Sequence, residues 1–264
     1  MQSFFYLSIV IVIALAELAL QRFRMVGISE RDNWLDLVFF LQSLVVVGPL
    51  LAYGLAAVET HFLPEYAGRF AYVAFGWQFL AFIICDDLVQ YWFHRAVHTY
   101  RWLWPLHSPH HSAPYMGVRM VFRNGFFYNL IFPNVWLSGL LVYLGFGKAF
   151  LWYSLLKAVV TLLAHSELRW DEPLYRRPVL RPLVWLLERT ISMPATHFAH
   201  HAANANDGIG NYNGNYGNLL FFWDVLFGTA LISRRYPEQY GLPEAERADS
   251  WKVMLFYPLF RARK

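Results

Sequence analysis

The chain has 264 residues, of which 57% are hydrophobic, 19% aromatic and only 15% charged. Soluble domains carry about 25% charged residues, so this composition disfavours a water-soluble domain and favours a membrane protein. The single cysteine, Cys85, excludes an internal disulfide framework. The isoelectric point near 9.1 fits a basic face against anionic lipid better than a nucleic-acid partner, because the sequence has no basic-aromatic recognition motif.

The first apolar run, "FFYLSIVIVIALAELAL" at 4–20, predicts a retained membrane anchor rather than a signal peptide. No positively charged region precedes it, and no small-residue cleavage site follows it. A bilayer core needs roughly 20 apolar residues of helix, and the segments 3–20, 34–58 and 70–93 each satisfy that length. The sequence therefore predicts three membrane spans before residue 94.

Two further apolar segments, 126–146 and 149–165, predict a tight helical pair joined at "GFGK". Pro133, Gly139 and Gly145 lie within the pair, so it is expected to kink or to enter the membrane and return. In both cases the two ends of the pair lie on the same side.

The distribution of arginines predicts the orientation. Three arginines follow the first apolar run within 22–33, one follows the second run, and four lie within 94–125. The positive-inside rule then places 22–33 and 94–125 in the cytoplasm and the N-terminus outside.

Beyond residue 165 the chain is more polar, and "NANDGIGNYNGNYGN" at 204–218 predicts turns, some of them with positive φ. The last segment, 231–264, mixes aromatic residues with arginines and is typical of a membrane interface. Apart from two similar histidine boxes there is no internal repeat, and there is no linker. Residues 1–264 are therefore predicted as one all-α membrane-embedded domain, with its N-terminal spans in 1–69.

Nine of the ten histidines fall at predicted cytoplasmic positions near the membrane: His94, His98, His107, His110, His111, His165, His197, His200 and His201. Residues i, i+3 and i+4 of a helix lie close together on its surface. His94 and His98 therefore point the same way, and each H-x-x-H-H box offers two imidazoles on one face and a third rotated away. One metal rarely needs more than six donors, so this set fits two metals better than one. The tenth histidine, His61, is interpreted as an ordinary loop residue.

A shell of neutral imidazoles leaves the charge of a metal uncompensated and favours carboxylates nearby. Asp87, His94 and His98 share one predicted helix face, and Asp86 is adjacent. Glu167 follows the predicted hairpin. An acidic pair inside an apolar span is costly, which favours a functional role.

Several of these residues also fit plainer interpretations. His94 and His98 by themselves are equally typical of an ordinary surface helix. His165 also fits a helix end at the membrane interface, and Asp86 and Asp87 also fit the boundary of the hydrocarbon region.

The combination of "HRAVH", "HSPHHS", a lone histidine closing a helical hairpin, and "HFAHH" resembles the fatty acid hydroxylase/sterol desaturase superfamily. The flanking "DDLVQYWF" and "NYGNLLFFWDVLFGT" resemble it too, so the similarity covers about residues 80–230. Members are membrane-bound di-iron oxygenases. The resemblance implies that the nine histidines ligate two irons, and it places Asp87 and Asp224 in the catalytic site in supporting roles. One departure is the longer insert "AANANDGIGNYNG" after the third box, which bears on the substrate more than on the metal site.

The resemblance further implies O2 as co-substrate and two electrons from an external donor. The sequence has no dinucleotide fingerprint and no haem-binding domain, so a separate cytochrome b5-, ferredoxin- or reductase-type protein is expected as electron donor. The predicted protein is a multi-pass helical bundle with a cytoplasmic histidine-rich helical cap. It is expected to hydroxylate or desaturate a fatty-acyl, ether-lipid or sterol-like substrate, with carotenoid hydroxylation as a related alternative.

The alternative from another functional class is a membrane metal transporter or metal-binding protein. Transport predicts metal ligands spread through the depth of the spans, whereas the histidines gather at one predicted surface. A non-catalytic scaffold is the third alternative, and the near-complete set of histidines disfavours it.

Overall fold

The computed structural model describes residues 2–20, 28–205, 207–243 and 249–261, with side chains from residue 8 onward. Throughout these ranges the regular elements are helices, and the only β contact is an isolated bridge between Ala202 and Tyr240. The predicted all-α class is therefore confirmed. Arg22 and Arg24, which entered the predicted orientation, lie outside the described residues.

Two sets of helices follow one another along the chain. The first set consists of α1 (Gln2–Ala19), α2 (Glu30–Leu41), the π-helical η1 (Gln42–Val47), α3 (Gly48–Phe62), the short η2 (Pro64–Tyr66), α4 (Phe75–Ala81), the π-helical η3 (Phe82–Asp86), α5 (Asp87–Thr99) and α6 (Trp104–His111). The second set consists of η4 (Val118–Phe122), α7 (Phe126–Ile131), α8 (Pro133–Leu141), η5 (Val142–Phe146), α9 (Gly147–His165), α10 (Glu172–Tyr175), η6 (Pro178–Leu180), α11 (Arg181–Thr190), α12 (Pro194–His200), α13 (Phe222–Phe227) and α14 (Trp251–Phe256).

The longest continuous helix runs through α2, η1 and α3. It starts at a capping box, in which the Ser29 side chain accepts from the Asp32 amide and Asp32 accepts in return from Ser29. The π-helical stretch η1 ends where the Gly48 amide donates to the Ser43 carbonyl. The next residue is Pro49, which has no N–H and displaces the carbonyl one turn before it, so a wider turn here removes that conflict.

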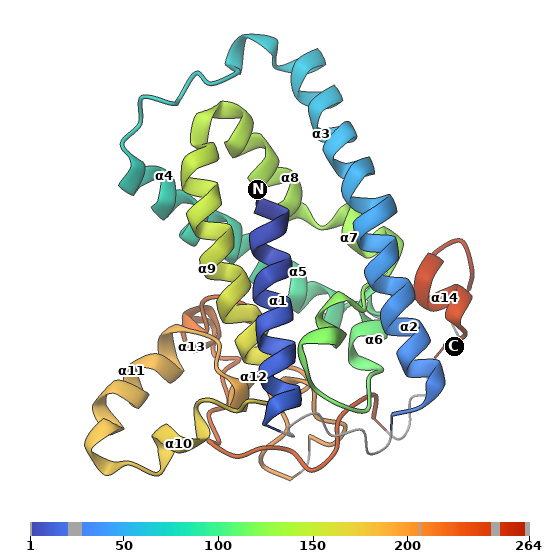
Figure 1. Ribbon diagram of the computed structural model, residues 1–264, viewed down its shortest axis with the longest axis vertical. Helices are drawn as coiled ribbons and strands as arrows, with labels where there is room; N and C mark the ends of the chain where they lie inside the picture. Colours follow the sequence, from blue (N-terminus) through green and yellow to red (C-terminus); the bar gives the residue numbers. More distant parts are fainter. Residues whose placement is uncertain (1, 21–27, 206, 244–248, 262–264) are drawn as a thin grey trace.

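The helices α8 and α9 form a hairpin, as the sequence predicted (Figure 1). The turn lies at Gly145, whose φ of 114° is unfavourable for residues with a side chain. Pro133 starts α8 and separates it from α7. The hairpin carries His165, at the C-terminal end of α9, back toward the lower half of the molecule in Figure 1.

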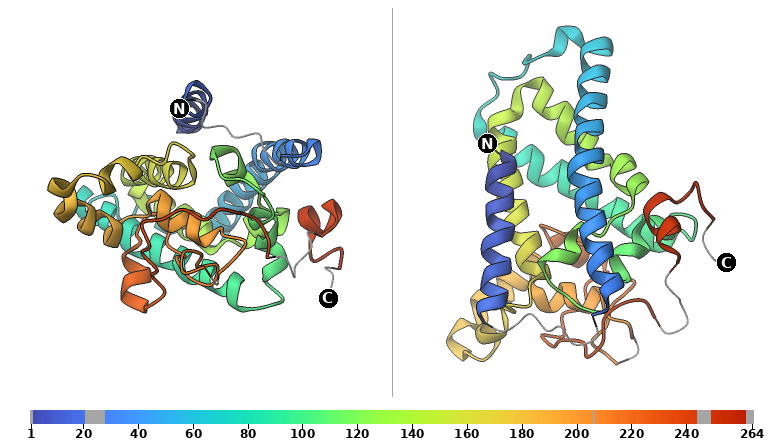
Figure 2. Two further views of the ribbon diagram at one scale, coloured as in Figure 1. Left: turned by 90° about the horizontal axis from the view of Figure 1, so that it is seen from below. Right: turned by 45° about the vertical axis from the view of Figure 1, so that its right-hand side comes forward.

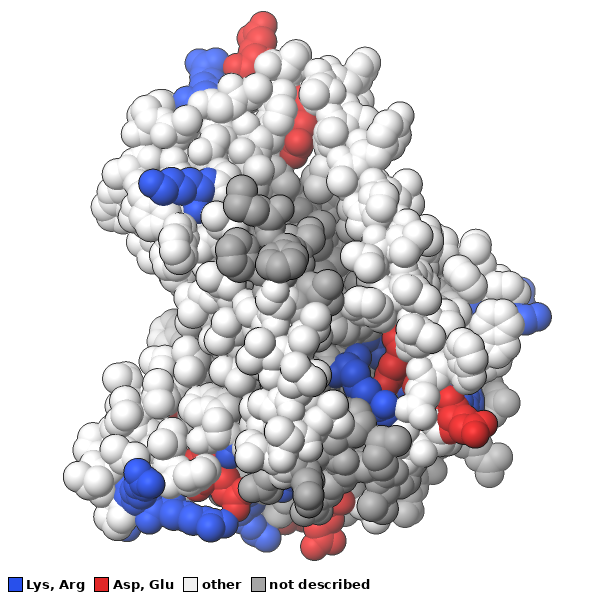
Figure 3. Space-filling view, in the orientation of Figure 1, with Lys and Arg blue, Asp and Glu red and all other residues white. Residues whose placement is uncertain are grey.

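Within the described ranges, two helical segments are long and apolar enough to cross a membrane, Glu30–Phe62 and Pro133–His165, and Ser8–Ala19 is a shorter apolar helix. The predicted span at 70–93 was wrong in this respect: helix begins only at Phe75, and the buried Gln78, Asp86 and Gln90 make it more polar than a lipid-facing span. Figure 3 shows one face on which uncharged side chains cover most of the surface, with many of the charged side chains in the lower part and a few at the upper end.

The helix α1 lies at the rim of the molecule, packed on α9 (Figure 2). Its lower end is fixed by Glu17, a fully buried carboxylate that accepts from the Ser166 hydroxyl at 2.6 Å and the Glu167 amide at 3.0 Å. This contact holds the end of the apolar helix beside the residues that follow His165. The helix α12 packs on α9 from another side, and α5 packs on α6.

The C-terminal segment, predicted to lie at a membrane interface, is partly packed on the protein. Met254 and Leu255 of α14 are buried against Leu35 and Phe39 of α2. Trp251, in contrast, is 52% exposed.

Replacing Gly145 with alanine is expected to destabilise the hairpin. A Cβ at this position would lie 2.7–2.9 Å from atoms of Ala71, and the positive φ adds strain of about 1–3 kcal/mol. The Tm of the purified protein in detergent should fall. Gly76→Ala is the matched control, because nothing lies within 4 Å of its Cβ position, and a Tm equally low in both variants would contradict the prediction.

Candidate metal centre

Nine histidines from four helices and their ends meet in the lower half of the structure. Their side-chain nitrogens form two groups, in each of which one ligand atom per residue lies within 4.8 Å of the others. Group A contains His94, His98, His107, His111 and His200; group B contains His110, His165, His197 and His201. All are buried except His98, which is half-buried. The structure thus brings together every histidine that the sequence singled out, and His61 lies apart on the exposed end of α3.

The two H-x-x-H-H boxes are each divided between the two groups. In the box at 107–111 the first and last histidines enter group A and the middle one enters group B, and in the box at 197–201 the assignment is reversed. Residues i and i+4 are about 40° apart around a helix axis, whereas i+3 lies about 60° away on the other side. The spacing therefore directs one helix toward two neighbouring points. The groups adjoin where the rings of His111 and His201 stack with centroids 4.3 Å apart.

Backbone carbonyl oxygens orient four of the rings. The Nδ1 atoms lie 2.7 Å from the Tyr216 oxygen for His94, 2.7 Å from the Gly214 oxygen for His200, 2.7 Å from the Thr161 oxygen for His165 and 3.3 Å from the Met120 oxygen for His110. A carbonyl oxygen only accepts, so in each ring Nδ1 carries the proton and donates it. The opposite nitrogen, Nε2, is therefore left with a free lone pair, as in histidines that bind metals.

These free lone pairs face one another. In group A the Nε2 atoms of His94 and His200 are 3.1 Å apart, and in group B those of His110 and His165 are 3.3 Å apart. Neither atom of either pair has a proton to donate, so the contact is repulsive unless a cation lies between them. With metal–imidazole bonds of about 2.0–2.1 Å, such separations correspond to angles of about 95–110° at the ion. Each group therefore fits one metal ion.

Other ring nitrogens support the same conclusion. Both nitrogens of His98 and of His111 are buried without a hydrogen-bond partner among the described residues. Burial lowers the pKa of seven of these imidazoles well below its usual value, namely His98, His107, His110, His111, His197, His200 and His201. They are therefore neutral near pH 7, the form in which imidazole binds metals. Imidazole suits iron, zinc, copper and nickel alike, so the donor set alone does not select the metal.

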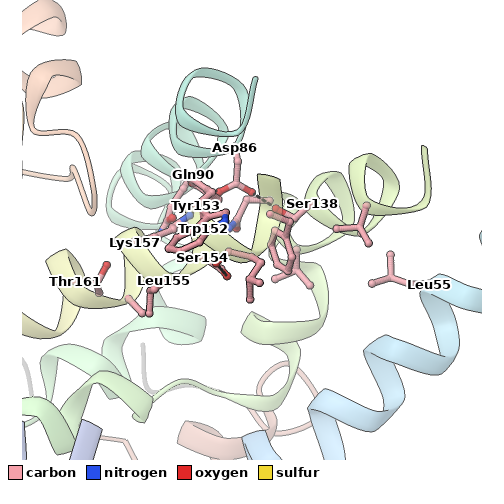
Figure 4. Close-up of a pocket in the computed structure, with 17 residues that line it drawn as sticks. Leu55, Asp86, Gln90, Ser138, Trp152, Tyr153, Ser154, Leu155, Lys157 and Thr161 are labelled. Atoms are coloured by element: carbon pink, nitrogen blue, oxygen red, sulfur yellow. Dashed lines mark hydrogen bonds and ion pairs between the residues drawn. The ribbon is translucent and has the colours of Figure 1, made fainter. Parts of the chain in front are cut away.

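A cavity of about 830 Å³ lies beside the histidines, between α3, α8, α9 and the η3–α5 helix (Figure 4). Gln90 and Thr161 line it, and each lies four residues, or one helical turn, before a histidine: His94 of group A and His165 of group B. The remaining lining is mainly apolar, from Leu55 of α3 to Phe150 of α9. Each histidine group is thus connected to the cavity lining through one turn of helix.

Comparison with known proteins identifies the family. Residues 79–229, more than half of the chain, match the fatty acid hydroxylase family. The chain belongs to this family. The predicted resemblance over about residues 80–230 is therefore confirmed.

Curated relatives of this fatty acid hydroxylase family member include lipid-modifying enzymes. The chain is 29% identical over 190 residues to an alkylglycerol monooxygenase of Danio rerio. The aligned region covers 65% of this chain and 35% of the relative. It is 27% identical over 186 residues to an ornithine lipid hydroxylase of Rhizobium tropici, covering 70% of this chain and 47% of the relative. The chain thus spans about a third to a half of the length of these relatives. No solved structure matches the chain.

The two aspartates that the family resemblance implicates lie behind the histidines. Asp87 accepts from the Leu219 and Leu220 amides at 3.3 and 3.0 Å and from the Trp223 indole N–H at 3.0 Å. Asp224 accepts from the Tyr216 and Gly217 amides at 2.8 and 2.6 Å. Both carboxylates therefore fix the segment whose Tyr216 carbonyl orients His94. Burial raises the pKa of Asp224 to about 6, while its hydrogen bonds favour the ionised form.

The turn directly after the asparagine-rich insert also supports the centre. Asn215, with φ of 55°, lies between the two residues whose carbonyls orient His200 and His94. Its side chain donates to the Thr196 and Leu231 carbonyls at 2.8 and 3.0 Å and accepts from the Leu231 amide at 2.7 Å. This residue, like Tyr216 itself, was not singled out from the sequence. An asparagine in a turn region shows no signal of a role in positioning a distant histidine.

Asp86 and Glu167, the other carboxylates considered from the sequence, have cationic partners instead. Glu167 pairs with Arg169 at 2.9 Å. Asp86 pairs with Lys157 at 2.6 Å inside the cavity. Lys157 was missed by the sequence reasoning, although a lone lysine in the apolar segment 149–165 is the kind of residue that marks a functional position.

We expect His110→Ala to lower the metal content of the purified protein without preventing its insertion into membranes. The change removes one nitrogen of the facing pair in group B. Metal per chain is measured by mass spectrometry, with His61→Ala as the control. Full metal content in the His110→Ala protein would exclude this residue as a ligand.

Asp87→Asn is expected to weaken metal retention by about 10–100-fold, the usual loss when a group that orients a ligand is changed. The carboxamide keeps the size of the side chain but replaces one of the two oxygens that accept from three N–H groups with a donating NH2 group. Competition with a chelator measures the retention. An unchanged affinity would show that the 216–220 segment is held without this carboxylate.

Proposed function

We propose that the chain is an O2-dependent lipid hydroxylase of the membrane, with one iron in group A and one in group B. The single observation that carries the metal sites is the pair of facing lone pairs in each group, at 3.1 and 3.3 Å. The family and its lipid-modifying relatives support iron and oxygen chemistry over the other metals that imidazole accepts. Nine histidines divided five and four support two ions rather than one.

The proposed reaction inserts one oxygen atom of O2 into a C–H bond of a lipid. The other oxygen atom leaves as water, using two electrons from a separate electron-transfer protein and two protons. Bound iron supplies the redox chemistry with O2 that protein side chains lack. Desaturation, in which the lipid loses two hydrogens instead, uses the same components.

The residues of the chain bind, orient and exclude water. The backbone carbonyls of Tyr216, Gly214, Thr161 and Met120 hold four rings with Nε2 toward the ions. Asp87 and Asp224 order the segment that contains Tyr216, so they act as positioning residues. The cavity holds the alkyl chain in an apolar environment, which keeps water from the oxidised carbon.

The proposal includes a multi-pass membrane protein with its histidines at the cytoplasmic side. Two candidate spans support membrane association. In Figure 1 the helix α1 runs from the middle of the molecule down to the histidine-containing end, and α2–α3 returns upward. With arginines frequent after residue 93, the positive-inside rule places that end in the cytoplasm. Lipid then enters from the bilayer and electrons from the cytosol.

Metal transport is disfavoured by the same geometry. The histidines form two compact groups near one end of the molecule, and no described histidine continues this set along α2–α3 except the exposed His61. A transport route needs ligands at several depths.

We expect cells that produce the chain to accumulate lipids heavier by one oxygen atom, detected by lipid mass spectrometry. Cells producing His110→Ala should show none of this product, whereas His61→Ala should match the unchanged protein. Lipids lighter by two hydrogens would show a desaturase. An unchanged lipid profile in cells whose purified protein carries iron, with an electron donor co-produced, would contradict the proposed function.

A further inference from the structure

A charged pair lies in the otherwise apolar cavity. Asp86 of η3 accepts from Lys157 of α9 at 2.6 Å, from the Ser138 hydroxyl at 2.6 Å and from the Tyr153 hydroxyl at 2.5 Å. The Asp86 side chain is 1% exposed and that of Lys157 is 16% exposed. A charge at this depth in a candidate span is costly and by default indicates a function.

Three residues that line the same cavity each carry a buried oxygen atom with no hydrogen-bond partner in the part of the chain that the structure describes. These atoms are Oε1 of Gln90, Oδ1 of Asn134 and Oγ1 of Thr161. The Gln90 and Asn134 side chains are more than nine-tenths buried, at 7% exposure each. Buried acceptors without donors destabilise a fold. A ligand that donates hydrogen bonds to these atoms would remove that cost. We name Asp86, Gln90, Asn134 and Lys157 the polar station.

We propose that the polar station binds the polar end of the lipid substrate, and that this end is uncharged and carries a hydroxyl or amide group. The unpaired amide oxygens need an O–H or N–H donor. An ammonium group has three N–H bonds. Among the described residues, the hydrogen-bond partner of Lys157 is Asp86. Lys157 therefore has N–H groups left to donate to a ligand oxygen. The Asp86–Lys157 pair is neutral overall, so it does not require a charged ligand. A hydroxyl or amide group can both donate to the amide oxygens and accept from Lys157. This inference rests on the proposed function.

The place of the polar station also predicts where oxidation occurs. Asp86, Gln90 and His94 follow one another at intervals of one turn along one helix, as do Lys157, Thr161 and His165 along another. The polar station thus lies four to eight residues, roughly 6–12 Å along the helix axis, from a histidine of each group. Figure 4 shows Asp86, Gln90 and Lys157 grouped between Thr161 at one end of the cavity and Leu55 at the other. A lipid tail in the apolar part points away from the histidines, so the oxidised carbon lies near the polar end.

A purely structural ion pair that joins η3 to α9 is the competing explanation. It accounts for the contacts of Asp86, but not for the unpaired oxygens of Gln90 and Asn134 in the same cavity. A structural pair also gives no reason for selectivity among lipids that differ only in their polar ends. Selective binding therefore separates the two explanations.

The test measures binding of three probes that share one chain, namely hexadecanol, its methyl ether and hexadecanoate. The full chain is purified in detergent with its metal content verified, and each probe competes with radiolabelled hexadecanol. We expect hexadecanol to bind about tenfold more tightly than the ether, which lacks the donor, as for one buried hydrogen bond. Equal binding of alcohol and ether, or tighter binding of hexadecanoate than of hexadecanol, would overturn the inference.

Two variants assign the selectivity to the polar station. Gln90→Leu/Asn134→Leu removes the two amide oxygens that lack donors, so it should leave folding intact and reduce the preference for alcohol over ether to about twofold or less. Lys157→Met should weaken binding of both probes, because each offers it an oxygen. Lys148→Met, an exposed lysine on the same helix, is the matched control and should leave binding unchanged. Tm and metal content confirm that each variant is folded. Full alcohol preference in the double variant overturns the assignment.

The position of oxygen in the product completes the test. In cells that produce the chain, the new oxygen should lie in the half of the lipid chain next to its polar group, as located by fragmentation in mass spectrometry. Oxygen in the half that ends in the methyl group would overturn the inference and leave the proposed function standing. Selective binding of hexadecanol without any oxidised lipid would instead contradict the proposed function and leave the binding site standing.

Discussion

The arrangement of the lower half of the molecule depends on four backbone carbonyls that accept from histidine Nδ1 atoms. Each such bond fixes the ring and leaves the lone pair of Nε2 pointing inward. Two of these lone pairs meet within 3.1–3.3 Å in each histidine group, a contact that only a cation stabilises. The local fold and the metal are therefore coupled, because the same contacts are unfavourable without the ion and favourable with it.

Much of the chain outside the histidine boxes serves to hold those carbonyls in place. Asp87 on α5 and Asp224 on α13 anchor the segment after the third box from two directions. Asn215 fastens the turn between Gly214 and Tyr216. Glu17 connects the apolar helix α1 to the residues that follow His165. Each of these side chains forms hydrogen bonds with the backbone, which limits the cost of its burial.

The cavity differs from these sites, because some of its buried polar atoms lack hydrogen-bond partners among the described residues. Its Asp86–Lys157 pair is satisfied, yet Gln90 and Asn134 beside it keep oxygens without donors. Binding a lipid with a donating polar end would complete this network and also fill the apolar space. The helices that line the cavity include those that carry His94 and His165, so the proposed substrate site and the proposed metal sites share rigid elements.

The sequence by itself determined the helical class, the hairpin at Gly145, the family and the nine histidines, because each depends on spacing along one segment or on a pattern of short motifs. Only the tertiary structure decided how the boxes divide between two groups, which carbonyls orient them, and that Lys157 meets Asp86. Many of those contacts join residues 13 to more than 100 positions apart, such as His94 with His107 and His200. Helical periodicity shows which way a side chain points, but not which distant segment it faces, since that is set by the packing of whole helices.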